Sequence, residues 1–96
     1  MELLVTYDVA TDTAAGRRRL RHVAKVCEGY GQRVQKSVFE CIVNEADLEM
    51  LEHRLLRVID PTADSLRLYR LREPRDRYTH VVGQRPIHDV HDPLVL

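Results

Sequence analysis

Residues 3–9 form a mostly apolar, β-prone run with the sequence Leu-Leu-Val-Thr-Tyr-Asp-Val. A strand with one solvated face alternates apolar and polar residues, whereas a strand covered on both faces reads as a continuous apolar run. The run therefore predicts a strand in the middle of a sheet, buried on both faces. Asp8 interrupts it near its carboxyl end, so an acidic side chain is expected where the central strand ends.

Two later segments have the periodicity of amphipathic helices. The first follows the N-cap candidates Thr11-Asp12-Thr13 and ends at the Gly29-Tyr30-Gly31 stop. The second begins after Asn44 and ends before Asp60-Pro61. The residues expected to face the core are Leu20, Val23, Ala24 and Cys27 in the first helix, and Leu48, Leu51, Leu55 and Val58 in the second.

The remaining segments predict strands. Residues 33–43 are β-prone, but this run is long for one strand, so a break near Lys36 and Ser37 is expected. Residues 65–71 predict a further strand. After a proline turn, residues 78–82 predict a short extra strand.

The order β-α-β-β-α-β with one extra strand predicts an α+β, ferredoxin-like domain in which two helices cover one face of an antiparallel sheet. Residues 1–83 are assigned to this domain, and residues 84–96, with Pro86 and Pro93, to an irregular tail. The second sheet face would stay open on a monomer of 96 residues, which buries only about 60–70% of its unfolded surface. A two-fold homodimer that covers this face is therefore expected.

The net charge of the chain is zero, but its charges are segregated. Residues 17–36 are strongly basic with Glu28 as their single acid, and arginine dominates the basic residues of the chain. Arg17, Arg21 and Lys25 recur every four residues, so they are expected to form a basic ridge on the first helix. The arginine fork suits bidentate contacts with phosphate. The ridge fits nucleic-acid binding, and it also fits a helix face that is merely solvated.

Asp8 is the principal candidate for chemistry. A carboxylate at the end of a central apolar strand must reach solvent, an ion or a hydrogen-bond partner, because burying it unpaired is costly. It could cap the nearby helix or pair with an arginine. Alternatively it could bind magnesium, which prefers one or two carboxylates together with waters and substrate phosphates. One acid per chain is too few for such a site, whereas a symmetric dimer would supply two copies of Asp8.

Other parts of the sequence offer weaker chemistry. His88 and His91, with the acids Asp89 and Asp92, are a second metal candidate, but no third distant ligand is evident and a solvated tail is the preferred interpretation. No Ser-His-Asp order, glycine-rich phosphate loop or GxSxG elbow is present. The sequence therefore argues against acyl transfer and nucleotide hydrolysis.

Cys27 and Cys41 are the two cysteines of the chain, and both lie in apolar runs. Buried free thiols are therefore expected rather than a disulfide framework. No stretch approaches the ~20 apolar residues of a membrane span, and no signal peptide is recognised. A cytoplasmic protein without membrane contact is expected.

Three motifs together resemble the CRISPR-associated protein 2 family. They are Tyr7-Asp8-Val9 at the end of the first strand, Arg17-Arg18-Arg19 at the start of the first helix, and the run Arg-Val-Gln-Lys-Ser-Val-Phe-Glu at residues 33–40. The resemblance covers residues 1 to about 72, and the QxSVFE-type run is distinctive. This family comprises the small dimeric partners of the CRISPR integrase in spacer acquisition.

The resemblance implies a ferredoxin-like homodimer in which Asp8 of each subunit faces its copy across the two-fold axis and holds magnesium or another divalent cation. Tyr7 would flank this metal site. The short strand after Glu73 would lie against the partner subunit's sheet. By motif position, Arg17, Arg19 and Arg33 would contact phosphates, with Arg21 on the same ridge, and Ser37 and Phe39 would shape the hairpin beside the site.

The resemblance also implies nucleic acid and the CRISPR integrase as partners. Two hypotheses follow: a metal-dependent endonuclease acting on RNA or DNA, and a non-catalytic architectural dimer that holds a spacer precursor duplex between integrase subunits. Both use the same arginines, so the sequence does not separate them. A third interpretation, a generic ferredoxin-like RNA-binding module, is weaker because Phe39 and four tyrosines do not reproduce the paired stacking motif of such sheets.

Overall fold

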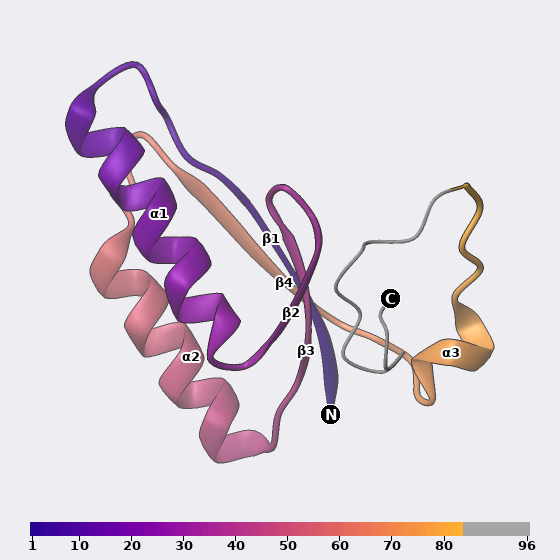
Figure 1. Cartoon of the computed structure of the whole chain (residues 1–96). Helices are drawn as coiled ribbons and strands as arrows, with labels where there is room; N and C mark the ends of the chain where they lie inside the picture. Colours follow the sequence, from indigo (N-terminus) through magenta and orange to yellow (C-terminus); the bar gives the residue numbers. More distant parts are fainter. Residues whose placement is uncertain (84–96) are drawn as a thin grey trace.

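The structure is a computed structural model that describes residues 1–83 (Figure 1). The predicted tail at residues 84–96, with the histidine candidates His88 and His91, lies outside the described residues. The elements in chain order are β1 (Glu2–Asp8), α1 (Ala14–Glu28), β2 (Gly31–Gln35), β3 (Val38–Ile42), α2 (Glu45–Val58), β4 (Ser65–Arg70) and α3 (Arg75–Tyr78).

The four strands form one sheet in the order β2-β3-β1-β4, and every neighbouring pair is antiparallel. β1 is therefore central, as its apolar sequence predicts. Helices α1 and α2 lie side by side on one face of the sheet (Figure 1). The predicted α+β, ferredoxin-like arrangement is confirmed, including the break between β2 and β3 at Lys36 and Ser37.

Both long helices begin at predicted capping residues. The hydroxyl of Thr13 accepts a hydrogen bond from the backbone N–H of Gly16 at 3.0 Å, and the Asn44 side chain accepts one from the N–H of Asp47 at 2.8 Å. Gly16 also lies against the preceding loop, because a Cβ at this position would stand 1.9 Å from the carbonyl oxygen of Ala10. The start of α1 is thus packed directly on the segment that leaves β1.

The core lies between the helices and one face of the sheet. Leu3, Val5 and Tyr7 of β1 point into it, whereas the alternate residues of that strand are half-buried or exposed. Within residues 1–83, β1 is therefore fully covered on one face only, because no second layer formed by these residues packs on the other. The remaining buried apolar residues are Val9, Val23, Ala24, Cys27, Phe39, Cys41, Val43, Leu51 and Leu55.

Cys27 and Cys41 are buried in this core and are not joined in a disulfide, as predicted. Burial raises the pKa of the Cys27 thiol to about 12 and that of Cys41 to about 11. Both groups therefore remain neutral thiols at physiological pH and act as small apolar side chains.

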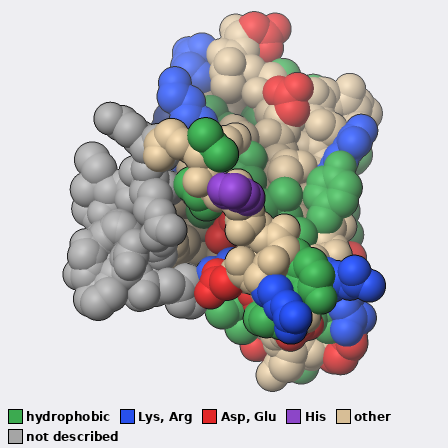
Figure 2. All heavy atoms as spheres, turned by 90° about the vertical axis from the view of Figure 1, so that its right-hand side faces the viewer, with side chains coloured by type: hydrophobic (Ala, Val, Ile, Leu, Met, Phe, Trp, Pro, Cys, Tyr) green, Lys and Arg blue, Asp and Glu red, His purple; other side chains and the backbone are tan. Residues whose placement is uncertain are grey.

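We call the uncovered side of the sheet the open face; it carries Leu4, Thr6 and Asp8 of β1, Val38, Glu40 and Ile42 of β3, and Ser65, Arg67 and Tyr69 of β4. Ile42 is 55% exposed and Tyr69 44% exposed. Figure 2 views the molecule from the side of α3 and shows apolar side chains interspersed with basic and acidic ones. Among residues 1–83, no helix is long and apolar enough to cross a membrane.

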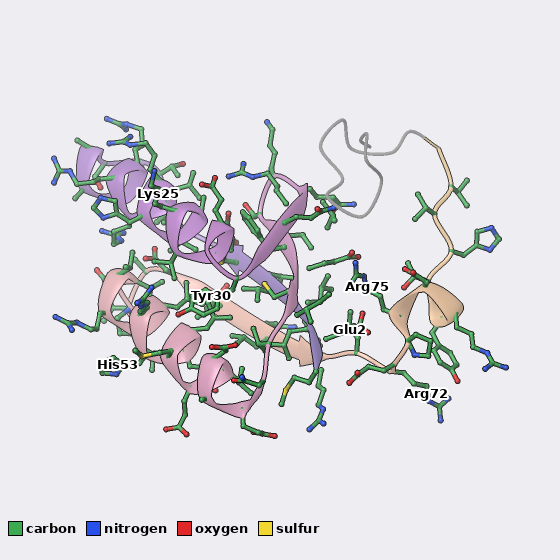
Figure 3. All side chains as sticks on the ribbon, turned by 60° about the horizontal axis from the view of Figure 1, so that its bottom comes forward. Glu2, Lys25, Tyr30, His53, Arg72 and Arg75 are labelled. Carbon is green, nitrogen blue, oxygen red and sulfur yellow. The ribbon has the colours of Figure 1, made fainter. Side chains whose placement is uncertain are left out.

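The predicted extra strand at residues 78–82 is not formed in the single chain. Residue Tyr78 ends α3, and residues 79–83 form no strand. Arg75 of α3 reaches back to the open face, where its guanidinium pairs with Glu2 at 2.9 Å and with Glu40 at 3.0 Å (Figure 3). These two ion pairs hold the Arg75 side chain against the open face. An apolar run such as Val81-Val82 becomes a strand only when another strand pairs with its backbone.

Candidate metal and nucleic-acid site

Asp8 is the last residue of β1 and lies on the open face, opposite Ser65 of β4 in the strand register. Its side chain is exposed and has no hydrogen-bond or ion-pair partner within residues 1–83. Neither structural role considered for Asp8 is observed within residues 1–83, because Thr13 caps α1 and no arginine of these residues pairs with Asp8. In this part of the chain, Asp8 is therefore a carboxylate without a partner at the end of the central strand.

The acids among residues 1–83 do not by themselves make a metal site. In the part of the chain that the structure describes, no group of three or more His, Cys, Asp or Glu residues could hold a metal ion. Asp8 alone offers a hard oxygen donor that matches magnesium chemistry but fills only part of its shell. The residues present fit a divalent cation only if a second copy of Asp8 completes the donor set.

The side chain of Tyr7 does not lie beside that of Asp8, although the two residues are adjacent in sequence. Adjacent residues of a strand point to opposite faces, and the Tyr7 ring lies in the core, 6% exposed, with its centroid 6.3 Å from that of Phe39. Its hydroxyl donates to the carbonyl oxygen of Lys36 at 3.4 Å. Burial raises the pKa of Tyr7, so the phenol stays protonated and can keep donating this bond. The placement favours a packing role for Tyr7 over the flanking role that the resemblance implies.

The predicted hairpin residues pack with Tyr7 rather than with Asp8. Phe39 is fully buried on the helix-covered side, and the Arg33 guanidinium lies 5.2 Å from its ring centroid. Ser37 lies in the turn between β2 and β3, and its carbonyl oxygen accepts a hydrogen bond from the N–H of Tyr7 at 3.1 Å. This cluster holds the hairpin turn against the carboxyl half of β1.

The basic ridge of α1 is exposed as predicted. Arg17, Arg21 and Lys25 are all exposed, and Lys25 extends away from the helix (Figure 3). One donor of Arg17 is used locally, since its Nη1 donates to the carbonyl oxygen of Thr11 at 3.1 Å. The other donors of this fork stay available to an anion.

Arg19 differs from the ridge residues because it pairs with Asp64, the buried charged residue of the core. Its Nε donates to Asp64 Oδ2 at 2.8 Å and its Nη2 to Oδ1 at 3.3 Å. The Asp64 side chain is completely inaccessible to solvent, whereas that of Arg19 is 22% exposed. The fork of Arg19 is thus occupied within the fold, whereas Arg17 and Arg21 have exposed side chains.

Sequence reasoning missed Asp64. Besides Arg19, its carboxylate accepts hydrogen bonds from the N–H of Ala10 at 3.1 Å and from the N–H of Asp60 at 2.9 Å. The bond from Arg19, aided by these two backbone bonds, holds the pKa of Asp64 at about 2 although burial opposes the shift. The sequence does place an acid directly before the strand predicted at residues 65–71. Such a position can indicate a buried carboxylate that needs a basic or backbone partner once the strand is covered.

Comparison with known proteins places the chain in a family. Residues 1–79 match the family model described as CRISPR associated protein Cas2. The chain is 59% identical to the CRISPR-associated endoribonuclease Cas2 1 of Moorella thermoacetica over 96 residues, with all of both chains covered. It is 48% identical to the CRISPR-associated endonuclease Cas2 of Halalkalibacterium halodurans, with 99% of each covered.

A solved structure agrees with these sequence matches. The crystal structure of Streptococcus pyogenes Cas2 at pH 6.5 superposes with a TM-score of 0.79 at 54% sequence identity, over 86% of this chain and 100% of that one. Fold, motifs and full-length relatives therefore agree, and the chain belongs to the Cas2 family of CRISPR-associated proteins.

Proposed function

We propose that this protein is a metal-dependent endonuclease of CRISPR adaptation that works as a two-fold homodimer in the cytoplasm. The observation that carries the proposal is the free, exposed carboxylate of Asp8 at the end of the central strand. The nuclease activity named for the relatives supports the same chemistry, because both names describe cleavage of a nucleic-acid chain.

The site needs a dimer because each chain brings one carboxylate, that of Asp8, to the end of its central strand. Asp8 shares the open face with Ile42 and Tyr69, whose exposed apolar surface is suited to burial against a second copy. A two-fold axis near the end of β1 would bring the two Asp8 carboxylates together. Two carboxylates leave room for waters and a substrate phosphate around magnesium.

In the proposed reaction, the two Asp8 carboxylates bind the cation and the basic ridge of α1 binds the phosphates. A bound divalent cation would supply the Lewis acidity that polarises a scissile phosphate. Asp8 would hold the cation, and Arg17 and Arg21 would bind and neutralise the phosphates of the nucleic acid. Residues 9–13 alone connect Asp8 to the helix that carries the ridge, so both parts lie on consecutive elements.

A second function, an architectural dimer that holds duplex DNA for the CRISPR integrase, is supported by the exposure of the ridge. Arg17, Arg21 and Lys25 are free to bind a duplex whether or not Asp8 carries a cation. The RNA-binding module is disfavoured, because Tyr7 and Phe39 are buried, which leaves Tyr69 as a single aromatic residue among the strand residues of the open face in place of a paired stacking motif.

Asp8→Asn separates the two functions, since it keeps the size of the side chain and removes the charge that holds a cation. We expect it to abolish magnesium-dependent cleavage of both RNA and duplex DNA while leaving folding and duplex binding intact. In an integration assay with the partner integrase, the architectural role predicts that Asp8→Asn remains active. Glu52→Gln, which removes an exposed charge from α2, is the matched control and should cleave normally. Cleavage that persists in highly purified Asp8→Asn protein would overturn the nuclease assignment.

A further inference from the structure

The carboxylate of Asp64 joins three segments of the chain. Its oxygens accept from the guanidinium of Arg19 in α1, from the N–H of Ala10 in the loop after β1, and from the N–H of Asp60 in the loop before β4. With two bonds to each oxygen and no exposure to solvent, the group is fully used inside the protein. A buried charge satisfied in this way fixes the segments that donate to it.

Two of these segments border Asp8. Asp64 immediately precedes Ser65, the residue opposite Asp8 in the β1–β4 register, and Ala10 lies two residues beyond Asp8. The β1–β3 register ends earlier, at Thr6 and Val38. The backbone around Asp8 is therefore held through its pairing with β4, and the hydrogen bond from Ala10 to Asp64 extends this attachment beyond the end of β1.

The helix contributes to the same attachment. Gly16 of α1 packs against the carbonyl oxygen of Ala10 so closely that a Cβ has no room. Arg19, in the next turn of the helix, reaches over to Asp64. Helix α1, the loop after β1 and the start of β4 are thus joined by packing and hydrogen bonds close in sequence and register to Asp8.

We propose that Asp64, held by Arg19, is a positioning residue that fixes Asp8 so that two copies of Asp8 meet one cation. The inference deepens the proposed function and rests on it. It also gives Arg19 a role in the metal site in place of the phosphate contact. Groups hydrogen-bonded directly to a metal ligand change metal affinity or activity by about 10–100-fold when they are replaced. Asp64 acts on Asp8 only through the backbone of Ala10 and Ser65, so its effect should lie at the lower end of that range.

The test is a titration with Mn²⁺ followed by electron paramagnetic resonance, which needs no substrate. Asp64→Asn places an amide N–H₂ group among donors that need an acceptor, and we expect it to weaken Mn²⁺ binding by about 10-fold. Amide hydrogen exchange at Ala10 should become faster in the same variant. Arg19→Lys keeps the charge but replaces the fork by a point donor, and it should weaken Mn²⁺ binding less. Glu52→Gln serves as the control with wild-type affinity, and Arg19→Lys decides the question if Asp64→Asn does not fold.

The outcomes separate this inference from the proposed function. Wild-type Mn²⁺ affinity in Asp64→Asn and Arg19→Lys, together with lost affinity in Asp8→Asn, would overturn the positioning role alone. Wild-type affinity in Asp8→Asn would overturn the proposed metal site itself. An Arg19→Lys protein that binds Mn²⁺ normally but duplex DNA poorly would show that Arg19 contacts phosphate and would overturn its role in holding Asp64.

Discussion

Asp64 remains ionised inside the fold because every oxygen lone pair that it buries meets a donor. The bond from Arg19, with the backbone bonds from Asp60 and Ala10, holds its pKa at about 2. The same carboxyl group titrates near ~3.9 in an unfolded chain. The folded state therefore prefers the charged form, and the stabilisation that this brings is present above the unfolded pKa and lost as the pH falls toward the folded one.

This linkage predicts how Asp64→Asn changes the pH dependence of stability. The variant should be less stable than the wild type at neutral pH, and the gap in free energy of unfolding should narrow as the pH falls from about 4 to about 2. Urea titrations at a series of pH values measure it. Glu52→Gln should keep the wild-type profile, and a gap that stays constant down to the lowest pH would refute the linkage.

Tyr7 and Asp8 are neighbours in sequence whose side chains lie on opposite faces of β1. The separation follows from the two-residue period of a strand, so it was available from the sequence once residues 3–9 were assigned as β. The sequence pattern alone did not show which of the two side chains faces the core, because an apolar run without alternation does not distinguish the two faces of a strand. The partner of Arg19 could not be predicted in this way, since Asp64 is distant in the chain and its burial depends on the complete fold.

Tyr7→Phe tests the packing role of Tyr7. The substitution removes only the hydroxyl and its 3.4 Å bond to the Lys36 carbonyl, so the loss of stability should be about 1 kcal/mol or less. The rate of magnesium-dependent cleavage should stay at the wild-type value. Loss of a proton-transfer group would instead slow the reaction by about 10²–10⁴-fold, and a decrease of that size would restore a catalytic role for Tyr7.

At the scale of elements, local patterns predicted most boundaries. Thr13 and Asn44 cap the two long helices where expected, because the N-cap signal is carried by a few adjacent residues. The strand predicted at 78–82 failed because strand formation depends on a partner and not on the segment itself. Local sequence likewise predicted the ridge on α1 but could not indicate that Arg19, within the same cluster, turns inward.

The ridge predicts a specific salt dependence for duplex binding. Arg17→Ala and Arg21→Ala should each weaken binding to unrelated duplexes equally and flatten the slope of log affinity against log salt by about 0.9. Arg57→Ala, an exposed arginine in the last turn of α2, is the control and should keep the slope. Fluorescence anisotropy over a range of salt concentrations measures it. A preserved slope in the Arg17→Ala, Arg21→Ala double variant would mean that the ridge is only solvated.

At the scale of the whole molecule, helices α1 and α2 cover one sheet face, and within the described residues the other face is contacted by Arg75 of α3 through its ion pairs. This second face carries Asp8 at one end of β1 and the exposed side chains of Ile42 and Tyr69 toward the other, so the proposed assembly and the proposed metal binding involve the same surface. The mutual repulsion of two carboxylates across an axis is relieved when a cation binds between them. Occupancy of the site should therefore depend on the dimer.

The stoichiometry of cation binding tests this account most directly. Calorimetric titration with Mg²⁺, on protein whose mass by light scattering is twice 11.2 kDa, should give one high-affinity cation for every two chains. In Asp8→Asn this binding should disappear while the dimer remains. One cation per chain, or unchanged binding in Asp8→Asn, would contradict a shared site at the ends of the two central strands.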